Sequence, residues 1–101
     1  MLSLSKKTDY ALIALAYLGQ VRGEHSPHAT SESDAVSARK IADKHSLPLP
    51  LLMNLLKDLV RARIVTSVRG ATGGYRLAVD PADVSLLDVV QAIDGPVQMV
   101  E

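Results

Sequence analysis

Ser67-Val68-Arg69-Gly70-Ala71-Thr72-Gly73-Gly74-Tyr75-Arg76-Leu77 is the stretch of the chain that decides the fold. Residues of β-forming type flank a turn rich in glycine, and glycine permits the positive φ angles that tight turns require. Arg69 and Arg76 stand near the two ends of this turn. The pattern predicts a β-hairpin over residues 64–78 with basic side chains at its base.

Two short helices are predicted directly before the hairpin. Ser37 suits the N-cap of a helix over residues 38–45. Pro50 suits the first position of a helix over residues 50–62, because the N–H that proline lacks would be unpaired there. One face of this second helix carries apolar residues at helical spacing: Leu52, Leu55, Leu56, Leu59 and Val60. Two helices joined by a short turn form a helix-turn-helix, and the hairpin makes it a winged one.

The remaining segments complete one domain over residues 1–101, mainly α-helical with a small β-hairpin. A first helix over about residues 5–19 is apolar on nearly all sides, which is typical of a helix that packs on a partner subunit as well as on its own core. Residues 22–35 are polar and aperiodic, so we expect a loop insertion there. A last helix is predicted over residues 85–94, capped by Ser85.

Charge is unevenly distributed along the chain. The net charge is zero, but residues 37–76 hold eight basic and two acidic residues, a net +6. Residues 77–101 hold five acidic residues and no basic one. Such a polarised surface matters more for partner choice than the total charge does. A basic segment that coincides with a predicted winged helix-turn-helix favours double-stranded DNA as the partner.

Several function classes are excluded by composition. The sequence contains no cysteine, so it provides no thiolate nucleophile and no cysteine metal site. No apolar run reaches the roughly 18 residues of a membrane span, and no signal peptide is recognisable, so we expect a cytoplasmic protein that does not enter a membrane. The glycines of residues 70–74 join two strands and offer no helix N-terminus to a phosphate. We therefore expect no enzymatic activity.

A set of short motifs runs through the chain: Leu4-Ser5-Lys6, Thr8-Asp9-Tyr10-Ala11-Leu12, Ile41-Ala42, Leu55-Leu56-Lys57-Asp58-Leu59, Ser67-Val68-Arg69-Gly70, Gly73-Gly74-Tyr75-Arg76-Leu77 and Ser85-Leu86-Leu87-Asp88-Val89-Val90-Gln91-Ala92-Ile93-Asp94-Gly95-Pro96. Through these motifs the chain resembles the IscR/NsrR-type winged-helix regulators, also called the Rrf-two family. The resemblance covers nearly all of the chain outside residues 22–35. Within the family, residues 1–6 and 47–50 are most similar to the branch that regulates the SUF iron–sulfur assembly system.

The resemblance implies a homodimeric transcriptional regulator that binds DNA operators and responds to an iron–sulfur cluster. In the family, three cysteines that hold the cluster follow an acidic-Gly-Pro motif, which is Asp94-Gly95-Pro96 here. In the SUF-like branch the first cysteine follows a Thr-Glu pair, and Val100-Glu101 stands in that place. We therefore expect the cluster-binding segment and the dimerisation helix after residue 101, and no cofactor held by this sequence alone. Asp9 is a candidate ligand to the partner subunit's cluster.

Candidate DNA contacts lie in the helix-turn-helix and the hairpin. Arg69 is the strongest, because guanidinium groups are favoured in narrow minor grooves. Pro50, Met53 and Asn54 lie at the front of the second helix, where base edges are read, and only Asn54 among them has a good hydrogen-bonding side chain. Candidates for phosphate contacts, which position a protein without specifying a sequence, are Lys6, Arg39, Lys57, Arg61 and Thr72.

Two alternatives stay open. The chain belongs either to a cluster-sensing regulator or to a shorter relative that acts without a cluster. A winged helix also serves as a protein-interaction module, and the apolar first and last helices would then be its docking surface. The second alternative predicts that the basic side chains are scattered over the surface and that the protein does not bind DNA even at low salt.

Overall fold

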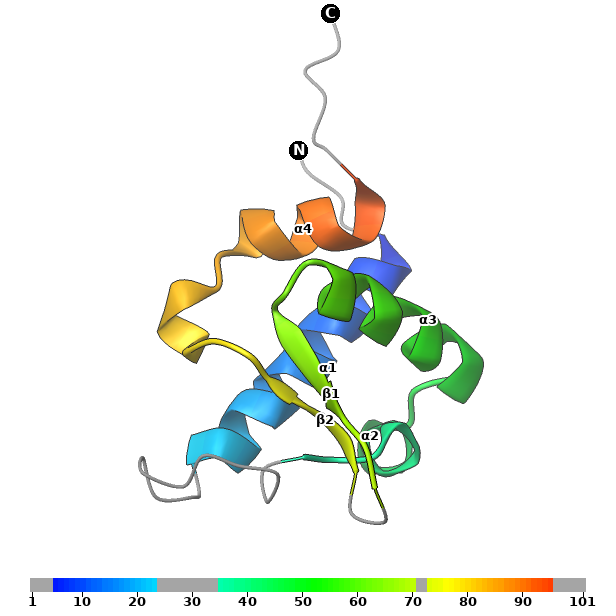
Figure 1. The fold of residues 1–101 in the computed structure, drawn as a ribbon. Coiled ribbons are helices and arrows are strands. Elements are labelled where there is room, and N and C mark those ends of the chain that lie inside the picture. The colour runs from blue at the N-terminus through cyan, green and yellow to red at the C-terminus, as the bar shows by residue number, and fades with distance from the viewer. Residues whose placement is uncertain (1–4, 24–34, 71–72, 96–101) are drawn as a thin grey trace, which may run out of the picture.

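A computed structural model describes residues 5–23, 35–70 and 73–95. In chain order its elements are α1 (Lys6–Gly23), α2 (Ala38–His45), α3 (Leu49–Arg61), β1 (Val65–Val68), β2 (Gly74–Leu77), the 3-10 turn η2 (Pro81–Asp83) and α4 (Leu86–Asp94). Figure 1 shows α1 passing behind the hairpin, α4 lying across one end of the molecule and the hairpin pointing to the opposite end. The predicted architecture, mainly helical with a small antiparallel hairpin, is confirmed.

The helix-turn-helix forms largely as its sequence predicts. Ser37 is the N-cap of α2, and its hydroxyl accepts a hydrogen bond from a backbone N–H of the first turn. Ser46 ends α2 in the left-handed conformation, with φ of 54°, and turns the chain toward α3. α3 begins at Leu49 and not at the predicted Pro50, because the extended Pro48 already serves as its N-cap. Pro50 nevertheless lies in the first turn, where its missing N–H costs nothing.

The hairpin pairs in a register that runs from Val65 opposite Leu77 to Val68 opposite Gly74. Val36, directly before α2, adds an antiparallel bridge to Tyr75. Its N–H and carbonyl exchange two hydrogen bonds of 2.8 Å with the backbone of Tyr75. This bridge fixes the outer strand of the hairpin to the start of the helix-turn-helix.

The core is aliphatic, as a sequence without Phe or Trp requires. α3 contributes most to it, because its inward face buries four leucines almost completely: Leu52, Leu55, Leu56 and Leu59. Val60, predicted on the same face, is only partly buried. α1 packs against α3, α4 and β2, so its apolar residues join the helix-turn-helix to the last helix.

α1 extends beyond its predicted end. Apolar periodicity predicts a helix to about residue 19 followed by a loop over residues 22–35, but the helix continues through Gly23. The guanidinium of Arg22 donates a hydrogen bond to the backbone carbonyl of Val79, and Gly19 lies against Pro81. These contacts with the segment after β2 stabilise the last turn of the helix, and they are invisible in the local sequence.

The last helix agrees with its prediction. The hydroxyl of Ser85 accepts a hydrogen bond from the N–H of Asp88, and the carboxylate of Asp88 accepts one from the N–H of Ser85. This reciprocal capping box satisfies two N–H groups at the start of α4. The helix ends at Gly95, whose φ of 86° lies in a region that favours glycine.

Candidate nucleic-acid interface

The exposed side of α3 is a continuous stripe along the helix. It follows helical spacing opposite the buried leucines and consists of Pro50, Met53, Asn54, Lys57 and Arg61. All five residues of α3 that were predicted as candidate DNA contacts are therefore exposed. The front of the stripe is apolar apart from Asn54, and Met53 is 44% exposed. An exposed methionine has the chemistry to contact thymine methyl groups, and among the front residues Pro50, Met53 and Asn54 only Asn54 has a side chain suited to hydrogen-bond base edges.

The exposed side of α2 is basic. Arg39, Lys40 and Lys44 are exposed and, with Ser37 and Asp43, line an open groove of about 420 Å³. Only Arg39 among these bases was a sequence candidate. Lys40 and Lys44 could have been found from their spacing, because residues i and i+4 lie on the same face of a helix. Together with the stripe on α3, they extend the positive surface over both helices of the helix-turn-helix.

The hairpin lies beside the start of α2. A Cβ atom added to Gly74 would stand 2.4 Å from the carbonyl carbon of Val36 and 2.7 Å from the backbone nitrogen of Ser37. Arg69, directly after β1, is exposed. Thr72 lies outside the described residues. Arg69 therefore directly follows Val68, which pairs with the Gly74 that lies against the start of the helix-turn-helix.

The charges of the described residues separate in space. Figure 1 shows α4 at the end of the molecule opposite to the direction in which the hairpin points, and the segment of η2 at one side. The exposed carboxylates of these two elements and their flanks are Asp80, Asp83, Asp88 and Asp94. α2, which carries three exposed bases and the exposed Asp43, and the end of β1, which Arg69 follows, lie toward the end to which the hairpin points. Carboxylates on η2 and α4 repel a polyanion, whereas the bases of α2 attract one.

Two candidate residues lie apart from the hairpin. Lys6 and Asp9 are exposed in the first turn of α1, and that turn is hydrogen-bonded to Asp94 at the end of α4. Lys6 is therefore not brought together with Arg69 in one protomer. Asp9 instead lies in the turn of α1 that is bonded to the end of α4, directly before Gly95. No group of three or more side chains of the types that bind metals forms among the described residues.

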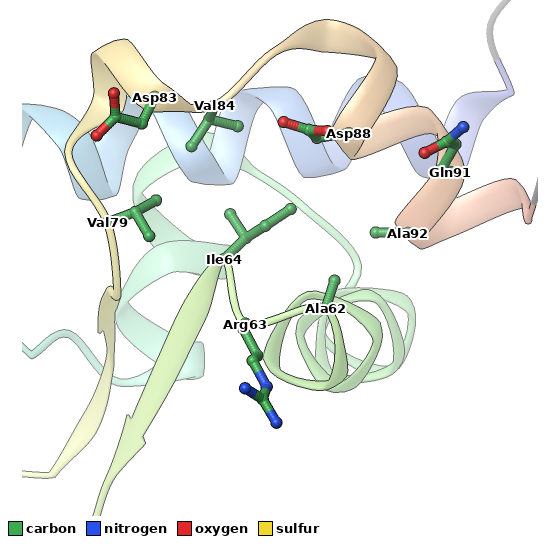
Figure 2. Close-up of a pocket in the computed structure, with 9 residues that line it drawn as sticks. All are labelled: Ala62, Arg63, Ile64, Val79, Asp83, Val84, Asp88, Gln91 and Ala92. Atoms are coloured by element: carbon green, nitrogen blue, oxygen red, sulfur yellow. The ribbon is translucent and has the colours of Figure 1, made fainter.

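A pocket of about 460 Å³ opens between the end of α3 and α4. Figure 2 shows the side chain of Ile64 pointing into it and the guanidinium of Arg63 pointing away. Arg63 is the one base among the nine residues labelled there, and Asp83 and Asp88 add acidic groups. The lining contains no nucleophile paired with a general base, so the pocket lends no support to an enzymatic function.

An apolar surface joins α1 and α4. Leu86 and Leu87 are 54% and 53% exposed, and Ile13 of α1 is 38% exposed. Beside Leu86, a groove of about 280 Å³ is lined almost entirely by apolar residues of α1, β2 and α4, among them Leu12 and Leu77. Exposed apolar side chains of this size are typical of surfaces that contact a partner when they form one patch. None of the helices in the described ranges has the length and hydropathy that a bilayer span requires.

Comparison with known proteins agrees with this geometry. A family model described as Rrf2, iron-dependent transcriptional regulator, matches residues 4–101. The chain is 37% identical over 94 residues to an rrf2-like helix-turn-helix regulator of Rhodobacter capsulatus, covering 93% of this chain and 59% of that protein. It is 30% identical over 96 residues to the regulator IscR of Cereibacter sphaeroides, covering 95% and 57%.

Solved structures extend the comparison to three dimensions. CymR (YrzC), the global cysteine regulator of B. subtilis, superposes with a TM-score of 0.83 at 32% identity, covering 100% of this chain and 71% of that one. IscR of T. potens gives a TM-score of 0.77 at 34% identity, covering 99% and 66%. The chain spans less than two thirds of the length of the two curated relatives named above. With its family model matched along nearly the whole sequence and its fold shared, the chain belongs to the Rrf2 family of helix-turn-helix transcriptional regulators.

Proposed function

We propose that this chain is the DNA-binding part of a cytoplasmic transcriptional regulator. One observation carries the proposal: the exposed stripe of α3, the basic face of α2 and Arg69 belong to neighbouring elements, while four of the exposed acids lie on or beside η2 and α4. A helix-turn-helix places its second helix in the major groove. α3 then reads base edges through Asn54 and Met53, and the bases of α2 and α3 contact phosphates.

Arg69 extends the contact beyond the major groove. Its place at the end of β1 leaves the guanidinium exposed beside the helix-turn-helix. Arginine is favoured in narrow minor grooves, where the negative potential is strongest. Arg69 therefore contributes through DNA shape as well as charge.

We expect Arg69→Ala to weaken binding to a preferred duplex by about 1–3 kcal/mol. Fluorescence anisotropy measures this with a duplex that the wild-type protein has selected from a random-sequence pool. Arg63→Gln is the control, because it removes one positive charge at an exposed position after α3, away from the hairpin tip. Equal titration curves for the wild type and Arg69→Ala would show that the hairpin arginine does not contact DNA.

We propose that the regulator is a homodimer. Leu86 and Leu87 of α4 are more than half exposed beside an apolar groove, and helix-turn-helix proteins commonly bind two half-sites as symmetric dimers. Packing of a second copy on Leu86 and Leu87 covers this surface and leaves α2, α3 and the hairpin free. Sedimentation equilibrium of the natural gene product tests the proposal, and a monomer at the highest soluble concentration contradicts it.

We propose that an iron–sulfur cluster regulates the longer protein, as in a regulator of SUF-type iron–sulfur assembly genes. The residues of this sequence do not fit a cluster by themselves, because no cysteine is present. The proposal therefore requires cysteines after Glu101. The family description as iron-dependent and the likeness to IscR proteins support it. The exposed Asp9 lies at the end of the fold from which those residues would continue.

We expect the natural gene product, purified without oxygen, to contain iron and to absorb visible light as iron–sulfur proteins do. Absorption spectroscopy with iron and sulfide analysis measures this. A colourless, iron-free protein that still binds DNA would favour the second candidate, a regulator that acts without a cluster. That candidate draws on the fold shared with CymR, described as a global cysteine regulator.

A further inference from the structure

The first turn of α1 is hydrogen-bonded to the end of α4. The hydroxyl of Ser5 caps α1 by accepting a hydrogen bond from the N–H of Thr8 at 3.1 Å. The carboxylate of Asp94 lies 2.9 and 3.0 Å from that hydroxyl. Its Oδ2 also accepts a hydrogen bond of 2.9 Å from the hydroxyl of the fully buried Thr8. One carboxylate of α4 thus holds two side chains of α1.

The same turn is ion-paired with α3. The Nζ of Lys7 lies 2.8 Å from Oδ2 of Asp58, and the two side chains are only 27% and 17% exposed. Lys7 directly precedes Thr8 in the sequence. Asp58 also lies 3.7 Å from Arg61, a long contact with a side chain that is 80% exposed. Two adjacent residues of α1 therefore contact two different helices: Thr8 bonds to the end of α4, and Lys7 pairs with α3.

The position of Asp94 is explained by α1 and not by its own helix. A carboxylate in the last turn of a helix is unfavourable with respect to that helix's dipole. The N-terminus of α1 provides a positive end of a dipole for the same carboxylate, together with two hydroxyl donors. The Asp94 carboxylate therefore joins α4 to α1. Its unfavourable interaction with the dipole affects only α4.

We propose that Asp94, Thr8, Lys7 and Asp58 form a positioning link that holds α3 relative to the end of α4. A displacement of Asp94 moves Thr8, and the helical turn carries Lys7 and Asp58 with it. This inference rests on the proposed DNA-binding function for its effect on affinity, but the link itself can be measured without DNA.

Hydrogen exchange of the full chain tests the link. Asp94→Asn and Lys7→Met are the variants, and each is expected to speed exchange of amides around Asp58 by about two- to thirtyfold. A role limited to capping α1 and α4 would change exchange only at those two helix ends. Unchanged exchange in α3 for Asp94→Asn overturns the link. Thr8→Val, which removes the hydroxyl and keeps the buried volume, replaces Asp94→Asn if that variant does not fold.

Two matched controls separate the link from a general loss of charge. Lys6→Met removes the same charge as Lys7→Met from the neighbouring position, and Lys6 has no ion pair among the described residues. Asp83→Asn removes an exposed carboxylate at which the described structure has no side-chain hydrogen bond. Both controls are expected to leave the exchange of α3 at the wild-type rate, and faster exchange in either one contradicts the link.

DNA titration distinguishes the inference from the function on which it rests. With the selected duplex, Asp94→Asn is expected to weaken binding about three- to tenfold without changing the salt dependence, because it removes no phosphate contact. If the amides of α3 exchange faster in the variant but its affinity for the duplex is unchanged, the link does not affect DNA binding. If the wild type itself binds no duplex, the proposed function fails while hydrogen exchange still decides whether the link exists.

Discussion

We expect Gly74→Ala to lower the free energy of unfolding by about 3 kcal/mol, a large share of the stability of a small domain. Gly74 has a φ of 154°, and a Cβ there would stand 2.4 Å from two backbone atoms of Val36. Neither obstacle is relieved by rotating a side chain. The hairpin would have to move away from Val36 and break the two hydrogen bonds that Val36 exchanges with Tyr75. Thermal or urea unfolding measures the effect, and the melting temperature should fall by about 12–24 °C.

Gly70→Ala is the matched control for this variant. Gly70 also has a positive φ, 115°, but a Cβ added there meets nothing within 4 Å. Gly70→Ala therefore has the unfavourable backbone conformation without a steric clash. It should lower the free energy of unfolding by about 1–2 kcal/mol. Equal stability losses in the two variants would show that the bridge between Val36 and Tyr75 does not hold the hairpin in place.

The second large effect is the salt dependence of DNA binding. A dimer in which about four bases per protomer contact phosphates releases about eight counterions. Its affinity should then fall on the order of 10³–10⁵-fold between about 50 and 200 mM salt. The exposed bases that α2 and α3 offer for this are Arg39, Lys40, Lys44, Lys57 and Arg61. Anisotropy titrations at a series of salt concentrations measure the slope.

Lys57→Gln tests whether α3 contributes to that slope. Lys57 is exposed in the middle of the stripe and forms no ion pair among the described residues. Removing it should lower the magnitude of the slope by about 1 for each protomer bound. If the affinity of the wild type does not depend on salt concentration, the protein makes no phosphate contacts, and the proposed DNA-binding function is wrong.

The sequence was sufficient where local rules decide the structure. Ser37 and Ser85 were predicted as N-caps, and both accept the expected hydrogen bonds. The spacing of the leucines in α3 predicted its buried face and therefore its exposed stripe. The glycines near Gly74 predicted a tight hairpin. Each of these follows from interactions between residues that are close in sequence.

Long-range contacts could not be predicted from the same patterns. Arg22 extends α1 by bonding to Val79, 57 positions away. Asp94 bonds to Ser5 across 89 positions. Apolar periodicity contains no information on such pairs, because their partners are chosen by the packing of elements that are distant in the chain. For the same reason the sequence predicted Arg39, Lys57 and Arg61 as interface residues but not that Lys6 lies apart from the hairpin. It also missed Lys40 and Lys44, although their helical spacing could have indicated them.

The account depends most on one claim, that the chain binds specific DNA through α2, α3 and the hairpin. The most direct test is an equilibrium titration at physiological salt with two duplexes of equal length and composition, one selected by the protein from a random pool and one scrambled. We predict that the selected duplex binds at least about 10³-fold more tightly. Equal affinity for both, or no binding to either, would contradict the claim and favour a winged helix that docks on another protein.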